Sequence, residues 1–365
     1  MSRIAMVSPY ALSAYGGVQE QVLAMSRTLS WRGHEVLVVC PDDSDSVEYG
    51  TPARVLRFGR RLSLPANGSR APITLSRSAA VAARQEVVRF APDVVHFHEP
   101  FAPALGYSLL ASHQFPSVAT FHRAGGGPAY SLTRPLLRYL SKSIDVAVSV
   151  SQAAAETISR EVGVSSSILF NGFEMSSFRM EERSARDRPK ILFIGRLEER
   201  KGVSTLLAAC RNEAEAKEWD VVIVGDGPER REVEATADAL ANVEFLGAVP
   251  TSTKMDLLAS SDVVVAPSLR GESFGLVLLE GLASGARVVA SDLQGYRMAG
   301  GECVEYFTPG DAGDLALTVN RALSTTTSAT QSLGRARAQE WSMDHLIERY
   351  EYLYGEAQNS FSSLH

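Results

Sequence analysis

Two successive series of short apolar runs, separated by helical patterns, constrain the fold of this chain more than any other feature. Strands that alternate with helices are typical of parallel sheets with crossover helices on both faces. In the first half the expected strands are Ile4–Ser8, Val36–Val39, Val55–Phe58, Val94–Phe97, Val118–Phe121, Ile144–Val150 and Ile168–Phe170. The series starts again in the second half, where the expected strands are Lys190–Ile194, Asp220–Val224, Val243–Phe245, Asp262–Ala266 and Arg287–Ala290. We therefore expect an α/β protein with two doubly wound, Rossmann-like domains.

The boundary between these domains is expected in the polar, charged stretch 174–189, which ends at a proline. The first domain then spans residues 1–173 and the second spans residues 190–340. An aromatic helix is expected at 341–357 and is expected to return to the first domain, whereas the polar tail Gln358–His365 is expected to fray. The carboxyl ends of both sheets are expected to face each other across a cleft, which is the usual ligand site in this architecture.

Length and composition fit an ordinary soluble protein. The chain of 365 residues is long for one domain, and it is 45% hydrophobic and 21% charged. No apolar run approaches the ~20 residues of a membrane-spanning helix, and the sequence enters its first strand without a signal-peptide pattern. The scattered Cys40, Cys210 and Cys303 show no metal-binding spacing. We therefore expect a cytoplasmic protein without a structural metal.

Charge is distributed unevenly between the two halves. Residues 1–176 carry 16 Lys and Arg against 13 Asp and Glu, whereas residues 177–365 carry 20 against 29. Within the first half, residues 54–89 hold eight arginines and one acid, Glu86. A basic segment of this kind favours an anionic partner such as a phosphate, an anionic lipid or a nucleic acid.

The segment Arg270–Glu280 combines two carboxylates with a glycine-containing turn at the start of an apolar helix. The unpaired N–H groups and positive dipole end of such a helix suit an anionic phosphate. A carboxylate such as Glu272 at the rim can accept hydrogen bonds from sugar hydroxyls. Phosphate and hydroxyl recognition together predict a nucleotide-sugar site.

Strand ends in the first domain carry further candidate groups. Gly16 and Gly17 precede a helix and permit close approach of a phosphate, although an ordinary strand–helix turn has the same pattern and the three-glycine dinucleotide spacing is missing. His122 ends a long strand and can donate to a sugar hydroxyl, and a structural role is an equal alternative. His96 and His98 share one face of another strand end. Metal ligation there lacks an evident third ligand, so ordinary polar strand-end residues are the simpler interpretation.

The loop Gly195–Gly202 follows the first strand of the second domain. Its Arg196 and Lys201 offer a bidentate fork and a point charge for a diphosphate leaving group. A solvated charge run is the alternative, and the flanking glycines favour a site. The tight turn Gly225–Pro228 ends another strand and is a weaker candidate for a contact to the nucleotide.

Taken together, these loops resemble the retaining glycosyltransferases of family 4, which have the two-domain GT-B fold. The residues that occur in the family's order are Gly16, Gly17, His122, Arg196, Lys201, Glu272 and Glu280. Within this family the chain is similar to the actinobacterial phosphatidylinositol mannosyltransferases. The shared motifs are Met6-Val7-x-Pro9-Tyr10, Gly16-Gly17-Val18-Gln19, Asn67-Gly68-Ser69, His96-x-His98-Glu99-Pro100, Gly271–Gly275 and Val289-Ala290-Ser291-Asp292-Leu293.

The resemblance implies a role for each matched position. Implied catalytic residues are His122, Arg196, Lys201 and Glu272. Implied donor-binding residues are Gly16, Gly17, Gly195, Lys254, Ser273, Phe274, Gly275, Leu276 and Glu280. Implied acceptor-binding residues are Tyr10, Asn67, Ser69, Arg70 and Arg123. In this scheme the diphosphate is held by the Gly17 N–H, Arg196 and Lys201. Glu272 accepts hydrogen bonds from the donor sugar, and Glu280 binds the ribose hydroxyls.

The resemblance also implies an activity. It is transfer of a hexose, with mannose from GDP-mannose favoured, to a phosphatidylinositol-like or other lipid-linked acceptor at the cytoplasmic membrane face. It implies weak association with an anionic membrane, with no metal, no cofactor and no nucleic-acid partner. One alternative is a family 4 hexosyltransferase that uses a UDP-sugar and a soluble acceptor, such as an inositol phosphate or a glycan. Another is a non-catalytic GT-B binding protein.

Three departures from the lipid enzyme's pattern keep these alternatives open. Where that enzyme has a polar run after the histidine, this chain has Arg123–Pro128. The helix expected at Leu75–Phe90 carries three arginines in place of a dense basic cluster. Acids expected near a guanine base are missing around Pro250–Lys254, although the lysine is kept. The first two departures concern the acceptor, and the third concerns the donor nucleotide.

Overall fold

The computed structural model describes residues 1–14, 16–43, 48–60, 62–66, 69–102, 105–123, 125, 128–180, 187–272 and 274–364. Within these ranges, the side chains of 63–66, 69–71, 128–131, 215 and 364 lie outside the description. The chain forms two compact units. Unit 1 comprises Met1–Gly172 and Met343–His365, and unit 2 comprises Phe173–Ser342.

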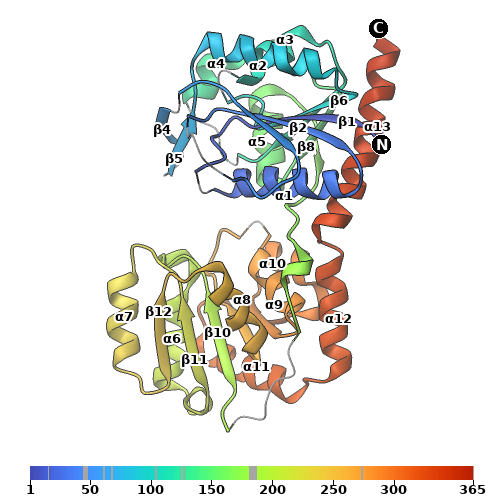
Figure 1. The fold of residues 1–365 in the computed structure, drawn as a ribbon. Coiled ribbons are helices and arrows are strands. Elements are labelled where there is room, and N and C mark those ends of the chain that lie inside the picture. Colours follow the sequence, from blue (N-terminus) through green and yellow to red (C-terminus); the bar gives the residue numbers. More distant parts are fainter. Residues whose placement is uncertain are drawn as a thin grey trace. The chain divides into compact units, whose positions relative to one another are not determined.

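Unit 1 contains a 7-stranded parallel sheet in the order β3-β2-β1-β6-β7-β8-β9 (Figure 1). Its strands are β1 (Arg3–Val7), β2 (Glu35–Cys40), β3 (Arg54–Arg57), β6 (Val94–His98), β7 (Ser117–Phe121), β8 (Val146–Ser149) and β9 (Ser167–Ile168). The chain runs outward from β1 to β2 on one side and continues from β6 on the other. This change of direction is the topological switch point of a doubly wound sheet, where ligands bind at the carboxyl ends of the strands.

Helices cover both faces of this sheet because alternate strand residues point to opposite sides. The helices of unit 1 are α1 (Gly17–Trp31), α2 (Arg77–Phe90), α3 (Leu105–Ser112), α4 (Pro128–Leu140), α5 (Gln152–Val162) and α13 (Met343–Leu364). Ile4 and Met6 of β1 belong to the core beneath α1 and α13. Ala5 and Val7 belong to the opposite core, to which α2, α3, α4 and α5 contribute.

Helix α13 forms part of unit 1 although it follows unit 2 in the chain. Its Met343, Ile347, Tyr350 and Tyr354 are buried in the same core as β1. The expected fraying of residues 358–365 is wrong, because α13 continues to Leu364. Phe361 gives a physical reason for the longer helix, since its ring meets the His113 ring edge-on at 5.2 Å between centroids.

A two-stranded antiparallel hairpin lies outside the main sheet of unit 1. It pairs β4 (Leu62–Ala66) with β5 (Ser69–Ile73). These two strands are not among those expected from the sequence, and Pro65 and Pro72 are unusual in regular strands. The dipeptide Asn67-Gly68, a strong hairpin signal, lies outside the described residues.

Unit 2 contains a 6-stranded parallel sheet in the order β12-β11-β10-β13-β14-β15, which places a second switch point between β10 and β13. Its strands are β10 (Lys190–Ile194), β11 (Asp220–Val224), β12 (Val243–Gly247), β13 (Val263–Ala266), β14 (Arg287–Ser291) and β15 (Glu305–Phe307). Its helices are α6 (Val203–Asn212), α7 (Arg230–Asp238), α8 (Thr251–Ser260), α9 (Leu276–Ala283), α10 (Gln294–Gly300), α11 (Ala312–Ser324) and α12 (Ser328–Gln339).

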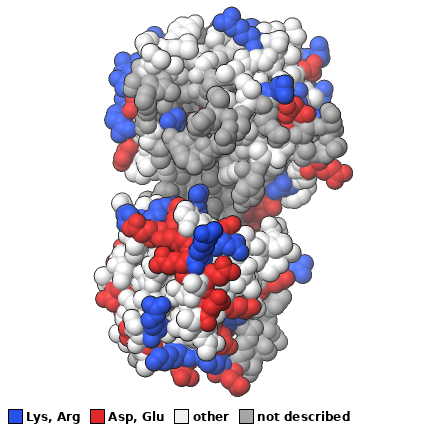
Figure 2. Space-filling model, turned by 90° about the vertical axis from the view of Figure 1, so that its left-hand side faces the viewer, with Lys and Arg blue, Asp and Glu red and all other residues white. Residues whose placement is uncertain are grey.

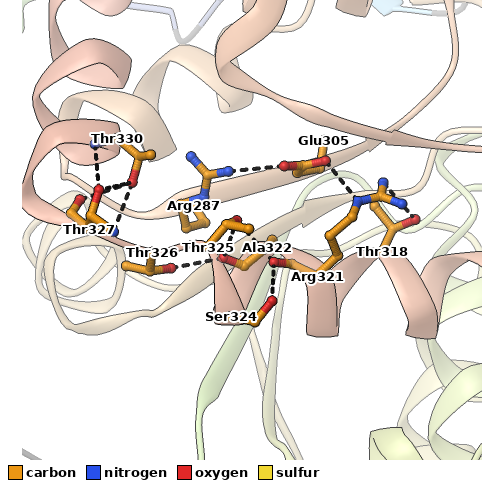
Figure 3. Close-up of polar contacts among 10 residues, drawn as sticks. All are labelled: Arg287, Glu305, Thr318, Arg321, Ala322, Ser324, Thr325, Thr326, Thr327 and Thr330. Carbon is orange, nitrogen blue, oxygen red and sulfur yellow. Dashed lines mark hydrogen bonds and ion pairs between the residues drawn. The ribbon is translucent and has the colours of Figure 1, made fainter.

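A run of hydroxyl side chains separates α11 from α12 (Figure 3). The hydroxyls of Ser324 and Thr325 donate to the carbonyl of Arg321, and that of Thr326 donates to the carbonyl of Ala322. The Arg321 carbonyl also accepts from the amide of Thr325, so these hydroxyls add to the hydrogen bonding of the last turn of α11. Thr327 then forms a reciprocal capping box with Thr330 at the start of α12.

Among the described residues, no helix combines the length and the apolar character needed to cross a membrane.

Candidate functional site

Three donors converge on one oxygen of Glu272, next to the switch point of unit 2. Lys201 Nζ lies 2.6 Å from Glu272 Oε1, Ser268 Oγ lies 3.0 Å away and Arg200 Nη1 lies 3.2 Å away. The carboxylate is buried, with a side-chain exposure of 8%. The described residues show no partner for Glu272 Oε2, so this oxygen can accept hydrogen bonds from a ligand.

Lys201 reaches Glu272 because two loops approach each other closely. It ends the 3-10 turn η3 (Glu199–Lys201) after β10, and the amide of Leu269 after β13 donates to the carbonyl of Arg200 over 2.8 Å. Gly202 follows with a φ of 66°, and a Cβ there would lie 2.0 Å from the carbonyl oxygen of Pro267. Glycine is therefore required for this approach.

Arg196 belongs to the same loop and is more exposed. Its side chain is 64% exposed, and its Nε lies 3.5 Å from Glu198 Oε2. The other oxygen of Glu198 lies 2.7 Å from Arg200 Nη2, so this ion-pair chain continues to Glu272. On the face shown in Figure 2, acidic and basic side chains lie intermixed on unit 2. Glu198 and Glu272 hold the guanidinium groups of Arg196 and Arg200 in the loop Gly195–Gly202, and these are cations of the kind that bind a diphosphate.

The N-terminus of α9 lies beside this carboxylate. Gly275 is the N-cap, with a φ of 103°, and no described side chain caps the first turn of the helix. A Cβ on Gly275 would lie 2.5 Å from the Tyr296 ring. The Tyr296 hydroxyl lies 2.8 Å from that of Ser268, which donates to Glu272. Open N–H groups at a helix start bind anions.

The neighbouring Phe274 anchors this loop by packing. Its side chain is buried, and its ring meets the Trp341 ring at 4.7 Å between centroids and 68° between planes. The ring is therefore committed to packing within unit 2.

Glu280, one turn into α9, forms a second ion pair. Lys254 Nζ of α8 lies 2.7 Å from Glu280 Oε1, and both side chains are partly buried. A carboxylate held in this way can accept hydrogen bonds from a diol at its other oxygen.

In unit 1, Gly16 and Gly17 lie at the start of α1, after β1. Gly16 is the N-cap and no described side chain caps this turn. A Cβ on Gly17 would have no atom within 4 Å, so open space borders this backbone. Tyr10 in the same loop is half-buried, and burial together with the nearby Glu99 raises the pKa of its hydroxyl. The arrangement leaves room for a ligand at the first turn of α1.

Glu99 fixes the backbone that carries His122. This buried carboxylate accepts hydrogen bonds through Oε2 from the amides of His122, at 2.8 Å, and Arg123, at 2.9 Å. Glu99 also has a φ of 45°, which is unusual for a residue with a side chain. Backbone strain of this kind persists where surrounding structure requires it.

The His122 ring continues a stack of imidazoles from β6. His96 and His98 have ring centroids 4.3 Å apart, and His98 and His122 have centroids 5.4 Å apart. Burial lowers the pKa of His122 to about 4 and that of His96 to about 3, and it holds the pKa of His98 well below its usual range. The three rings are therefore neutral at pH 7. His96 and His98 lie at the end of β6, as expected from the sequence, and both are buried. Among the described residues, no group of His, Cys, Asp or Glu could hold a metal ion at these rings.

Both halves of the chain match models of glycosyltransferase families. Residues 15–176 match Glycosyltransferase Family 4, and residues 188–325 match Glycosyl transferases group 1. The phosphatidyl-myo-inositol mannosyltransferase of Mycolicibacterium smegmatis is 35% identical over 319 residues, which cover 86% of this chain and 80% of that protein. The chain belongs to glycosyltransferase family 4.

Solved structures support the same fold at lower identity. Sucrose-phosphate synthase from Thermosynechococcus elongatus superimposes with a TM-score of 0.72 at 21% identity, covering 98% of this chain and 99% of that one. Anabaena HepE in complex with UDP and glucose gives a TM-score of 0.69 at 18% identity, covering 97% and 100%. This family 4 glycosyltransferase therefore has the GT-B fold, with two parallel-sheet α/β domains.

The structure of this glycosyltransferase brings some predicted site residues together. Lys201 contacts Glu272, and Lys254 contacts Glu280. Other predicted residues do not enter these contacts. Gly195 donates its amide to the Val224 carbonyl, Leu276 begins α9, Ser273 and Asn67 lie outside the described residues, and the side chains of Ser69 and Arg70 are not described.

Sequence reasoning missed residues that hold the predicted ones in place: Ser268, Arg200, Tyr296, Glu99 and His98. Of these, Glu99 and His98 carried a signal, because the shared motif from His96 to Pro100 contains them. Ser268 and Tyr296 carried none, since a serine or tyrosine near a strand end has no distinctive pattern.

Proposed function

We propose that this family 4 glycosyltransferase is a retaining enzyme that transfers mannose from GDP-mannose to a phosphatidylinositol-like or other lipid-linked acceptor at the cytoplasmic face of a membrane. The observation that carries this proposal is the Glu272 cluster, in which Lys201, Arg200 and Ser268 occupy Oε1. The mannosyl donor and the inositol lipid rest on the relative that is 35% identical over most of the chain.

The proposed chemistry follows from the charges around this cluster. Departure of the nucleoside diphosphate leaves an electron-deficient sugar carbon and a more negative phosphate. Lys201 and the exposed Arg196 are proposed to stabilise the phosphate in place of a metal ion, together with the first N–H groups of α9. Glu272 Oε2 is proposed to accept hydrogen bonds from the sugar hydroxyls. Fixed donors and charges of this kind need little reorganisation during the reaction.

An exposed surface of unit 1 supports the membrane part of the proposal. On α4, the side chains Leu132, Leu136 and Tyr139 are exposed by 85%, 45% and 60%. Their spacing of four and three residues places them on one helix face. Arg138 and Lys142 lie exposed beside them in the sequence. Apolar side chains flanked by cations favour the surface of an anionic bilayer.

Helix α2 adds a second surface of the same character. Val81 and Val88 are exposed, and Arg77 and Arg84 share their side of the helix at intervals of three and four residues. Each basic residue contributes only about 1 kcal/mol to binding an anionic surface. The proposed association is therefore weak and reversible.

A transfer assay tests the proposal directly. Purified protein is incubated with labelled GDP-mannose and vesicles that contain phosphatidylinositol, and vesicles without it serve as the control. Label in the lipid fraction is expected only with phosphatidylinositol. Absence of transfer to any lipid over a range of salt, pH and vesicle charge would overturn the lipid acceptor. Leu136→Glu with Tyr139→Glu should reduce vesicle binding while leaving nucleotide affinity unchanged.

One observation favours a second candidate, a hexosyltransferase that uses a UDP-sugar and a soluble acceptor. The first turn of α8, where Lys254 lies, carries no acidic residue. A guanine base offers N–H donors that suit a carboxylate acceptor, so this absence weakens the case for GDP. Thermal unfolding with saturating GDP or UDP separates the donors. Stabilisation by UDP alone, with transfer to an inositol phosphate or a glycan without membranes, would favour this second candidate.

A further inference from the structure

The imidazole of His98 links the candidate site to the interior of unit 1. His96 and His98 lie two residues apart on β6, opposite Val118 and Thr120 of β7. Their side chains therefore share one face of the sheet. His122 follows β7 directly, and its Nε2 lies 3.1 Å from His98 Nδ1.

His96 is fully hydrogen-bonded within unit 1. Its Nδ1 lies 2.9 Å from the Tyr354 hydroxyl, and its Nε2 lies 2.8 Å from Thr120 Oγ1. The Tyr350 hydroxyl lies 2.9 Å from the same threonine oxygen. This ring therefore has no nitrogen left for a ligand.

His98 is bonded on one side only. Its Nδ1 contacts His122, and its Nε2 is buried without a hydrogen-bond partner among the described residues. The bond between two neutral imidazoles carries one proton. The proton therefore resides either on His98 Nδ1 or on His122 Nε2, and this choice fixes the tautomers of both rings.

The buried Nε2 of His98 decides between these two arrangements. A proton on His122 Nε2 would leave His98 with a buried, unpaired N–H group. A proton on His98 Nδ1 leaves only a buried lone pair at Nε2. Orphaned buried N–H groups are rare in proteins, and we take the bare lone pair to be the less costly of the two unpaired states at this nitrogen. The second arrangement is favoured.

We propose that His98 is a positioning residue that holds His122 in the Nδ1–H tautomer, so that His122 presents a hydrogen-bond donor, and not a general base, to the reacting sugar. The tautomer is inferred from the geometry of unit 1, whereas the assignment of a sugar as the ligand rests on the proposed function. Glu99 fixes the backbone of His122 and His98 fixes its ring. These two contacts fix the position and direction of the His122 N–H donor. The direction matters, because a shift of about 1 Å in such a group can cost ~10²-fold in rate.

Nitrogen NMR of the free protein tests the tautomer without donor or acceptor. In protein labelled with ¹⁵N-histidine at pH 7, His122 is expected to show a protonated Nδ1 and an unprotonated Nε2, with signals assigned by His122→Asn. His98 is expected to show the same pattern. The opposite tautomer, or a doubly protonated His122, would overturn the proposal whether or not transfer is ever detected.

Two substitutions test the consequence for catalysis. His98→Asn keeps an N–H donor near the Nδ1 position and is expected to retain most of the transfer rate. His98→Ala removes it and is expected to lower kcat by ~10- to 100-fold with little change in the KM of the donor. His96→Phe is the matched control, since it is equally buried but does not touch His122. A purely structural role for His98 predicts equal losses in all three variants and overturns the proposal, and thermal unfolding shows which variants fold.

Discussion

The polar site residues of the two units differ in their charge. In unit 2 they are charged and paired, as Lys201 with Glu272 and Lys254 with Glu280. In unit 1 the three histidines at the site are neutral, because burial depresses the pKa of His122, His98 and His96. The ion pairs of unit 2 suit an anionic ligand, because its phosphates can compete with the carboxylates for the lysine and arginine cations. The neutral histidines suit sugar hydroxyl groups, which are recognised by well-directed hydrogen bonds and not by charge.

The largest effect is expected from Glu272→Gln, which removes the central charge of unit 2. Glutamine keeps the shape of the side chain but weakens acceptance from Lys201 and the sugar. Transfer is expected to fall by ~10²- to 10³-fold, while calorimetry with nucleoside diphosphate shows nearly unchanged affinity. Glu199→Gln is the control, because Glu199 is 70% exposed and pairs with Arg270. Loss of nucleotide affinity in place of transfer would show that Glu272 holds the nucleotide.

Gly275 in unit 2 and Gly17 in unit 1 both lie at the start of a helix, and their substitution by alanine is expected to have different effects. Gly275→Ala forces a Cβ within 2.5 Å of the Tyr296 ring, and a cost of about 1–3 kcal/mol in unfolding free energy is expected. Gly17→Ala meets no atom within 4 Å, so thermal unfolding should match the wild type while diphosphate affinity falls. Unchanged affinity and transfer in Gly17→Ala would contradict a phosphate contact at this backbone.

A smaller effect is expected from Glu280→Ala. The change removes the proposed acceptor for the ribose and leaves Lys254 without its 2.7 Å partner. Calorimetry should show nucleotide binding weakened by about 10-fold, equivalent to roughly 1.4 kcal/mol, with a smaller effect on the rate at saturating donor. Lys254→Met separates the two contributions. A fall in rate alone, with affinity intact, is the result that the role of Glu280 does not allow.

The neutral histidines of unit 1 predict a pH dependence of stability. Below pH 6.5 an unfolded histidine binds a proton, whereas native His96, with a pKa of about 3, does not. Stability therefore falls as the pH falls through this window, by about 1.4 kcal/mol per pH unit for each such histidine. Urea unfolding at pH 7 and 5 should show about 2 kcal/mol less loss in His96→Phe than in the wild type. Equal losses would mean that His96 titrates normally in the folded protein.

Much of the fold could be predicted from the sequence, because buried parallel strands are continuous apolar runs. Runs such as Val221–Val224 and Val263–Ala266 have no other simple interpretation in a chain of this length. Several elements escaped prediction, among them the short strand β15. The hairpin β4–β5 contains Pro65 and Pro72, α10 has glycine at its second and last positions, and α12 is polar with a threonine capping box that lacks the usual acid.

The candidate site could be predicted only in part. The charged loop Gly195–Gly202, the turn before α9 and the family resemblance pointed to Lys201, Glu272 and Glu280. Lys201 and Glu272 lie together because they follow β10 and β13, which are neighbouring parallel strands. The sequence could not show that Arg200, and not only Lys201, reaches Glu272, because this contact joins residues that are 72 positions apart in the chain. The shared motif contains His98, but the sequence could not show that its ring is buried against His122.

The return of α13 to unit 1 has a consequence for the order of folding. Unit 2 is one continuous segment, Phe173–Ser342, inserted between the two parts of unit 1. The core beneath β1 contains Ile347 and Tyr350 of α13, so unit 1 cannot close during synthesis until all of unit 2 has been made. The unit that begins first is therefore completed last, and until then the hydroxyl of Tyr354 is missing beside His96.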